Sequence, residues 1–122
     1  MTTRTMANTS DTFISGWIVL LFFSGCALLN HMLLPVYDKN NLALAIGWVA
    51  FSLYATLVLA IPFRRGKRWA WYISWIQVIV FGSLIFLDAD PELRGVVIMY
   101  VTAAGVMALC LFVTRPAFFR SE

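Results

Sequence analysis

The sequence predicts an all-α integral membrane protein, a four-helix bundle whose helices run up, down, up and down across the bilayer and are joined by short loops. The first reason is composition: 61% of the 122 residues are hydrophobic and only 12% are charged, about half the charged share of an ordinary soluble domain. The second is pattern, because the charged residues lie between four long apolar runs. Each run approaches the roughly 20 residues that a transmembrane helix needs. The bilayer is therefore the expected solvent.

The first predicted span covers residues 12–36 and follows a polar tail, residues 1–11, which we expect to be disordered and cytoplasmic. Within the span, Asn30 and His31 are strongly polar and lie near its far end, where Pro35 is expected to end the helix. One alternative stays open here. The run Phe23-Ser24-Gly25-Cys26 resembles the lipobox of bacterial lipoproteins, but the apolar run continues beyond it, which favours an uncleaved helix.

The second and third spans cover residues 42–63 and 69–87. The short polar turn at 37–41 forces the second helix to run antiparallel to the first. A dense basic turn follows, and cations and indole rings at such a position favour the lipid headgroups. The residues expected to set topology and contact headgroups are Arg64, Arg65, Lys67, Arg68, Trp69 and Trp71.

The fourth span covers residues 95–114 and follows an acidic turn at 88–94. Arg115-Pro116 is expected to stop this helix, since proline removes a backbone donor. The remaining residues, 115–122, form a short cytoplasmic tail in which Phe118 and Phe119 are expected to lie in the membrane interface.

The distribution of cations predicts the orientation. Of the nine Lys and Arg residues, two (Lys39 and Arg94) fall in the loops on one side, which leaves seven on the side of the termini and the basic turn. Cytoplasmic loops carry the excess of Lys and Arg. We therefore expect both termini in the cytoplasm of a multi-pass membrane protein, in the plasma (inner) membrane if the source is bacterial.

The run Arg64-Arg65-Gly66-Lys67-Arg68-Trp69-Ala70-Trp71 resembles a loop-to-helix pattern, basic-Gly-x-Arg-Trp-Ala-Trp, of small four-span microbial membrane proteins without an assigned activity. The match covers about eight residues and implies the same four-span architecture. It implies no catalytic residues.

The composition disfavours several functions. Basic residues at the ends of apolar runs, rather than along one polar face, argue against nucleic-acid binding. One histidine and two distant cysteines, Cys26 and Cys110, are too few for a zinc or haem site, so we expect no metal and no cofactor. Both cysteines are expected to be small buried apolar side chains.

Helical spacing places several polar or small residues on shared faces that should point inward. In the first span these are Gly16, Ser24, Ala27 and His31; in the second Trp48, Ser52 and Thr56; in the third Ser74, Gln77, Phe81, Leu84 and Asp88; in the fourth Thr102 and Gly105. Such faces usually serve interhelical packing and hydrogen bonding.

Two functions are compatible with these patterns. The first is a non-catalytic module that binds lipid, packs against a partner membrane protein or forms a homo-oligomer. Its small-residue positions would be Ala43, Gly47, Ala104 and Ala108, and its binding residues Asn30, His31, Gln77, Ser52 and Thr56. The alternative is a small isomerase- or cyclase-type membrane enzyme that uses His31 and Asp88 as acid and base on a hydrophobic substrate.

Overall fold

The computed structural model describes residues 2–37, 42–86, 91–92 and 94–119, and all regular structure in this part of the chain is helical. Four α-helices form it: α1 (Thr2–Tyr37), α2 (Leu42–Val58), α3 (Arg68–Ser83) and α4 (Arg94–Phe118). A π-helical turn, η2 (Leu59–Phe63), continues α2, and a 3-10 turn, η3 (Leu84–Phe86), continues α3. The predicted all-α, four-helix architecture is confirmed.

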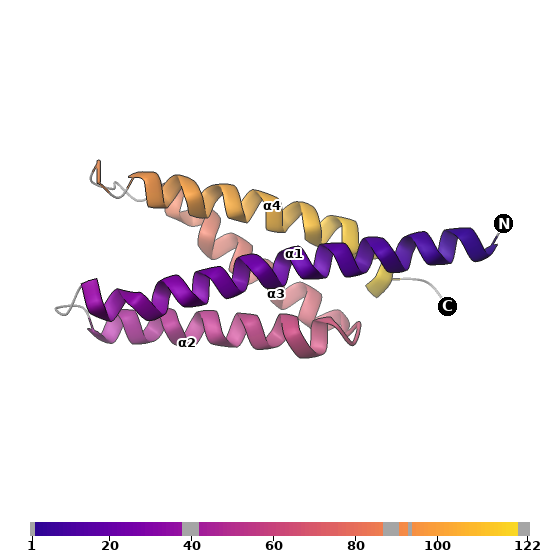
Figure 1. Cartoon of the computed structure of the whole chain (residues 1–122), viewed down its shortest axis with the longest axis horizontal. Helices are drawn as coiled ribbons and strands as arrows, with labels where there is room; N and C mark the ends of the chain where they lie inside the picture. Colours follow the sequence, from indigo (N-terminus) through magenta and orange to yellow (C-terminus); the bar gives the residue numbers. More distant parts are fainter. Residues whose placement is uncertain (1, 38–41, 87–90, 93, 120–122) are drawn as a thin grey trace.

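The helices pack in the spatial order α2, α1, α4, α3. Helix α1 lies along both α2 and α4, and α3 lies along α4. Helix α3 approaches α2 beside the basic turn and then diverges from it (Figure 1). The two termini lie at the same end of the molecule as this turn. We call this end of the molecule the basic end and the opposite end the distal end.

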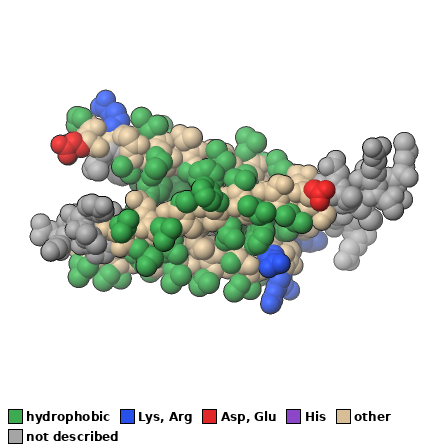
Figure 2. All heavy atoms as spheres, viewed as in Figure 1, with side chains coloured by type: hydrophobic (Ala, Val, Ile, Leu, Met, Phe, Trp, Pro, Cys, Tyr) green, Lys and Arg blue, Asp and Glu red, His purple; other side chains and the backbone are tan. Residues whose placement is uncertain are grey.

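The outer surface of the bundle is apolar. All four helices are long and apolar enough to cross a membrane, yet only 22–28% of each apolar window is buried within the bundle. Figure 2 shows hydrophobic side chains along the middle of the visible face and charged side chains towards the ends. A water-soluble bundle of this size would bury such side chains, so the distribution is typical of helices surrounded by lipid.

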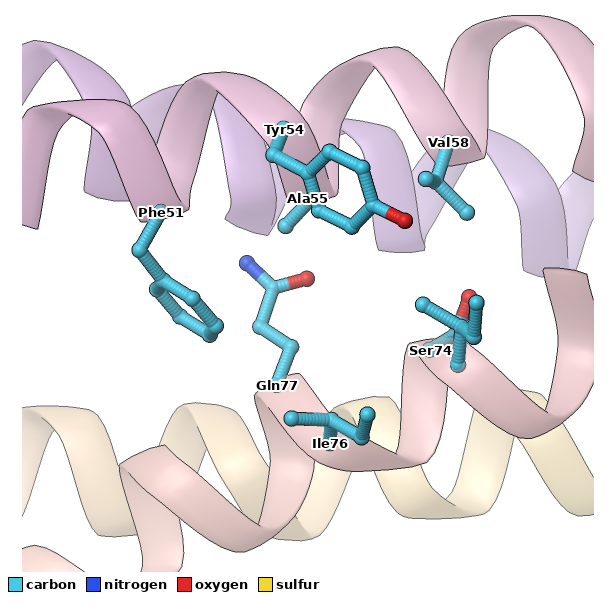
Figure 3. Close-up of a pocket in the computed structure, with 8 residues that line it drawn as sticks. Phe51, Tyr54, Ala55, Val58, Ser74, Ile76 and Gln77 are labelled. Carbon is cyan, nitrogen blue, oxygen red and sulfur yellow. The ribbon is translucent and has the colours of Figure 1, made fainter.

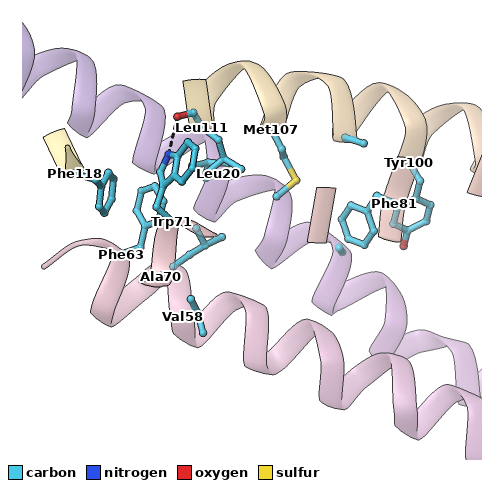
Figure 4. Packing of buried hydrophobic residues seen from close by; sticks show 13 residues of the cluster. Leu20, Val58, Phe63, Ala70, Trp71, Phe81, Tyr100, Met107, Leu111 and Phe118 are labelled. Carbon is cyan, nitrogen blue, oxygen red and sulfur yellow. Dashed lines mark hydrogen bonds between the residues drawn. The ribbon is translucent and has the colours of Figure 1, made fainter. Parts of the chain in front are cut away.

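The core runs along the length of the bundle. Leu20, Phe63, Met107 and Leu111 are fully enclosed. Phe63 packs against Phe118 at the basic end, with ring centroids 4.7 Å apart. Figure 4 shows this aromatic contact at one end and Phe81 beside Tyr100 at the other. The core therefore joins all four helices.

The basic turn has a defined backbone. Pro62 lacks an N–H group, and the chain around it adopts the π-helical turn η2. Trp17 Nε1 donates a hydrogen bond to the Leu59 carbonyl oxygen at 2.8 Å and so satisfies a backbone acceptor there. The amide of Gly66 then donates to Phe63 O (2.9 Å) and that of Lys67 to Pro62 O (3.0 Å), which is a Schellman motif. Gly66 has φ +70°, a conformation that favours glycine.

Two expected boundaries were wrong. Residues 2–11 continue α1 instead of forming an irregular tail, because extending an existing helix adds one backbone hydrogen bond for each residue fixed. Helix α4 does not stop at Arg115-Pro116 but continues to Phe118. Its last turn is held by packing, since Phe118 is only 3% exposed, and by Arg68 Nε, which donates to the Phe118 carbonyl at 3.0 Å.

Two aromatic residues expected at the interface lie inside the protein. Trp71 is 8% exposed and donates from Nε1 to Leu111 O at 2.9 Å, drawn as the dashed line in Figure 4. Phe118 is buried, as described above, whereas Trp69 is exposed as expected. The difference is one of helical phase: Trp69 and Trp71 are two positions apart, so they cannot share one face of α3.

Candidate functional site

A buried polar network connects all four helices. Gln77 of α3 donates from Nε2 to Ser24 Oγ of α1 (3.0 Å), and Ser24 Oγ lies 2.9 Å from Thr56 Oγ1 of α2. Thr56 has one hydroxyl proton and donates it to the Ser52 carbonyl (2.8 Å). Ser24 must therefore donate to Thr56. Each hydroxyl proton in this half of the network has one assigned acceptor.

The second half of the network is centred on His31. Its Nδ1 lies 2.5 Å from Ser52 Oγ, and its Nε2 lies 3.0 Å from the hydroxyl oxygen of Tyr100 on α4. Asn30 Nδ2 donates to the same Tyr100 oxygen at 2.7 Å. The Tyr100 ring is stacked on His31 with an interplanar angle of 7°. His31 is 5% exposed, and both of its ring nitrogens have a hydroxyl partner.

These contacts favour a neutral His31. A neutral imidazole donates at one nitrogen and accepts at the other, whereas the cation donates at both. With the cation, Ser52 and Tyr100 would both have to accept, and neither hydroxyl proton would have an acceptor within the described network. The neutral ring leaves only one such proton unplaced. His31 therefore bridges α2 and α4, and the pattern of hydroxyl partners favours its uncharged form.

Most residues expected on inward faces do lie inside. Gly16, Ser24, Ala27 and His31 of the first span are buried, as are Ser52, Ser74, Gln77 and Phe81, while Trp48, Thr56 and Leu84 are half-buried. The expectation for the fourth span was wrong, because Thr102 and Gly105 are exposed and the neighbouring Ala103 and Ala104 face the core. Four of the five proposed binding residues, His31, Ser52, Thr56 and Gln77, line the interior, and Asn30 lies at its edge.

Tyr100 was missed in the sequence, although a signal for it exists. It lies four, seven and eleven positions before Ala104, Met107 and Leu111, which are all buried, so it continues the inward face of α4. Asp88, the proposed acid/base partner of His31, lies outside the described residues. In the described part of the chain, the direct polar partners of His31 are hydroxyl groups.

Two apolar hollows adjoin the network. The first, which we call the lateral groove, has a volume of about 300 Å³ and lies between α1 and α4, with one wall from α3. It ends at the polar pair Asn30 and Tyr100. Its remaining walls are Phe22, Phe23, Cys26, Ala27, Phe81, Met99 and Ala103.

The second hollow, which we call the inner cavity, has a volume of about 250 Å³ and lies between α2 and α3, where these helices diverge. Figure 3 shows Gln77 reaching from α3 into this space towards side chains of α2. Gln77 Oε1 is buried and has no hydrogen-bond partner within the described residues. The walls are Phe51, Tyr54, Ala55, Val58, Ile73, Ser74, Ile76 and Gln77.

The side chains of the basic turn are exposed, and two of them have specific partners. The Arg64 guanidinium lies 5.3 Å from the centroid of the Trp17 ring, a cation–π contact that joins the turn to α1. Arg68 binds the carbonyl of Phe118 and lies 5.8 Å from the Phe119 ring. Arg68 therefore has a structural contact in addition to its charge.

The cysteines differ from the expectation of two buried thiols. Cys26 is exposed on the lateral groove, and Cys110 is half-buried; both are free thiols. Within the described ranges, no three His, Cys, Asp or Glu side chains come together in a group that could hold a metal ion.

Comparison of the chain with models of protein families, with curated proteins and with solved structures finds no match. The resemblance of Arg64–Trp71 to small four-span microbial proteins thus stays a prediction, and the network, the lateral groove and the inner cavity are the observations on which a function can be argued.

Proposed function

We propose that this protein is a multi-pass membrane protein, with both termini in the cytoplasm, that binds lipid as a non-catalytic module. Its apolar exterior and its four sufficiently long helices support residence in the bilayer. The basic turn and both termini share one end, so the excess of Lys and Arg in the sequence supports a cytoplasmic basic end.

The observation that carries the lipid-binding proposal is the composition of the lateral groove. Its apolar walls suit an acyl chain, whereas Asn30 presents an exposed amide at one end. Asn30 Nδ2 is bound to Tyr100, and Asn30 Oδ1 makes no hydrogen bond within the described residues. A polar atom facing hydrocarbon without a partner is unfavourable. A lipid would suit both the apolar walls and Asn30 Oδ1. Its acyl chain would fill the groove, and a donor of its glycerol or headgroup would form a hydrogen bond with Asn30 Oδ1.

The enzyme alternative has weaker support. A histidine that acts as acid or base must have a ring nitrogen within reach of the substrate. Both ring nitrogens of His31 are occupied by Ser52 and Tyr100, and the ring is 5% exposed. Proton transfer at His31 would first require one of these hydrogen bonds to break. Structural cross-linking of α1, α2 and α4 is the role that these contacts favour.

Native mass spectrometry of the protein in mild detergent tests the lateral groove. Ala103→Phe places a ring in the groove, and Ala50→Phe makes the same change on an exposed position of α2 outside it. We expect the wild type and Ala50→Phe to retain added phospholipid and Ala103→Phe to lose it while remaining helical. Equal lipid retention by all three proteins would contradict this site.

A second candidate, packing against a partner helix or another copy of the chain, is favoured by one face of α2. Ala43 and Gly47 are exposed and lie four residues apart, and a Cβ at Gly47 would meet no atom within 4 Å beyond the glycine, its chain neighbours and the local backbone of α2. Small residues at this spacing permit close helix approach in membranes. Gly47→Leu should reduce cross-linked dimer or complex in membranes; undiminished cross-linking would exclude this face.

A further inference from the structure

The inner cavity contains a buried hydrogen-bond acceptor without a partner. Gln77 is 2% exposed, and its Nε2 is used by Ser24, whereas its Oε1 has no partner within the described residues. Buried polar groups in proteins almost always have a hydrogen-bond partner, so each exception needs an explanation. Figure 3 shows that the amide projects from α3 into the space bounded by Phe51, Tyr54 and Ala55 of α2.

The orientation of the Gln77 amide decides which of its polar groups faces the cavity, and the surrounding hydrogen bonds favour the acceptor. Ser24 lies within hydrogen-bond distance of only one end of the Gln77 amide among the described bonds. Turning the amide over would place Oε1 at Ser24, and Ser24 would then donate to Oε1 instead of to Thr56. To keep the Ser24–Thr56 bond, Thr56 would have to donate to Ser24 and give up the Ser52 carbonyl, and the NH₂ group of Gln77 would have no partner. The orientation shown keeps the Thr56–Ser52 bond and leaves one acceptor facing the cavity.

The rest of the cavity is almost entirely apolar. Two further hydroxyl groups belong to its walls: that of Ser74 donates to the Ala70 carbonyl at 2.8 Å, and that of Tyr54, a residue that is 55% exposed, makes no hydrogen bond within the described residues. Among the described residues, no Lys, Arg or His lines the space, which disfavours a carboxylate or phosphate as occupant. A volume of about 250 Å³ is far larger than one water molecule requires, and a water needs two to four polar partners. The walls therefore favour an apolar molecule with a single donor.

The packing of the helices provides a route to this space. Because α3 lies along α4 and diverges from α2 beyond the basic turn, the cavity is a wedge between helices rather than a sealed void. Tyr54 and Ile76 on its walls are 55% and 51% exposed, so the wedge reaches the outer surface. An apolar molecule dissolved in a bilayer would enter it laterally.

From these observations we propose that the inner cavity binds an apolar alcohol, whose hydroxyl group donates a hydrogen bond to Gln77 Oε1 and whose hydrocarbon part lies between α2 and α3. This site is separate from the lateral groove: it shares no lining residue with it. The chemistry identifies the class of ligand, which includes isoprenoid and other long-chain alcohols. Specificity would come from the hydroxyl donor of the ligand and not from its hydrocarbon part.

A pair of probes that differ only in the donor tests the proposal. Geraniol and its methyl ether have the same hydrocarbon skeleton and an oxygen at the same position, but the ether cannot donate. Titrated into the full-length protein in detergent micelles, geraniol should bind about fivefold more tightly, as expected for one neutral hydrogen bond. Gln77→Met, which keeps the length of the side chain, should abolish the difference. Ser83→Ala, which removes an exposed hydroxyl outside the cavity, should preserve it.

A second pair of variants keeps the test decisive if Gln77→Met fails to fold. Ala55→Phe fills the cavity and should prevent binding of both probes, whereas Ala50→Phe, on an exposed part of α2 outside the cavity, should not. Equal affinity of the wild type for alcohol and ether, or undiminished binding to Ala55→Phe, would overturn the proposal. Loss of geraniol on Ala103→Phe but not on Ala55→Phe would also overturn it, by placing the alcohol in the lateral groove.

Discussion

The Arg68 side chain donates a hydrogen bond from Nε to the carbonyl oxygen of Phe118 at 3.0 Å, which joins the first turn of α3 to the last turn of α4. The last carbonyls of a helix have no partner within the helix, and a cation beside them is favourable. Pro116 removes one backbone donor from the same turn. The basic turn thus contributes to the stability of α4 as well as carrying charge.

Arg68→Ala should therefore loosen the end of α4. Losing a charge-assisted hydrogen bond at a partly exposed site should reduce the local opening free energy by about 1 kcal/mol, which corresponds to about fivefold faster amide exchange. Hydrogen exchange at residues 117–119 measures this. Arg65→Ala is the matched control, since Arg65 is exposed and its side chain makes no hydrogen bond within the described residues. Equal exchange in the two variants would mean that the Arg68 bond contributes nothing.

Tyr100→Phe should destabilise the bundle by about 1–3 kcal/mol, because it removes one partner each from Asn30 Nδ2 and His31 Nε2 inside the protein. Tyr54 is 55% exposed, and its hydroxyl makes no hydrogen bond in the described part of the chain, so Tyr54→Phe should change stability by less than about 0.5 kcal/mol. Thermal unfolding in micelles, followed by circular dichroism, compares them. If both variants unfold alike, the His31 half of the network is not stabilising.

Gly16→Ala and Gly25→Ala should have opposite effects. A Cβ at Gly16 would lie 2.7 Å from Thr114 Cγ2, and the Thr114 hydroxyl is held by the carbonyls of Cys110 and Leu111, so the methyl group cannot easily turn away. Overpacking of this kind costs about 1–3 kcal/mol. At Gly25 nothing lies within 4 Å, and alanine should stabilise the helix by about 0.5–1 kcal/mol. The same unfolding measurement decides; a Gly16→Ala protein as stable as Gly25→Ala would show that α1 and α4 separate at little cost.

Neutralising Arg64, Arg65, Lys67 and Arg68 together should produce mixed or inverted insertion, because three cations would then face two across the membrane. Fluorescent-protein and phosphatase fusions at the C-terminus report the orientation. Loss of most of the charge excess is the proposed cause, so restoring Arg64 and Arg65 should largely restore the original orientation. A single orientation in the quadruple variant would remove the basic turn as its determinant, and an external C-terminus in the wild type would overturn the proposed topology.

Sequence alone was sufficient for the helical class and for much of the inward-facing surface. Apolar runs of this length can satisfy their backbone groups in a bilayer only as helices, and the 3.6-residue period then places Ser24, His31, Ser74 and Gln77 on shared faces. Both features depend on neighbouring positions in one helix. They were therefore visible before any packing was known.

Only the tertiary structure determined which polar residues meet. The partner of His31 expected from the sequence, Asp88, lies outside the described residues, and the described hydrogen-bond partners of His31 are Ser52 and Tyr100. Depth within a span does not specify which helices are adjacent, so the sequence could not identify these two. Likewise, Thr102 and Gly105 lie on the outer side of α4, since the phase of that helix is set by the packing of Ala104 and Met107. The inner cavity depends on the divergence of α3 from α2. Such an angle results from contacts among all four helices, and no local pattern of residues encodes it.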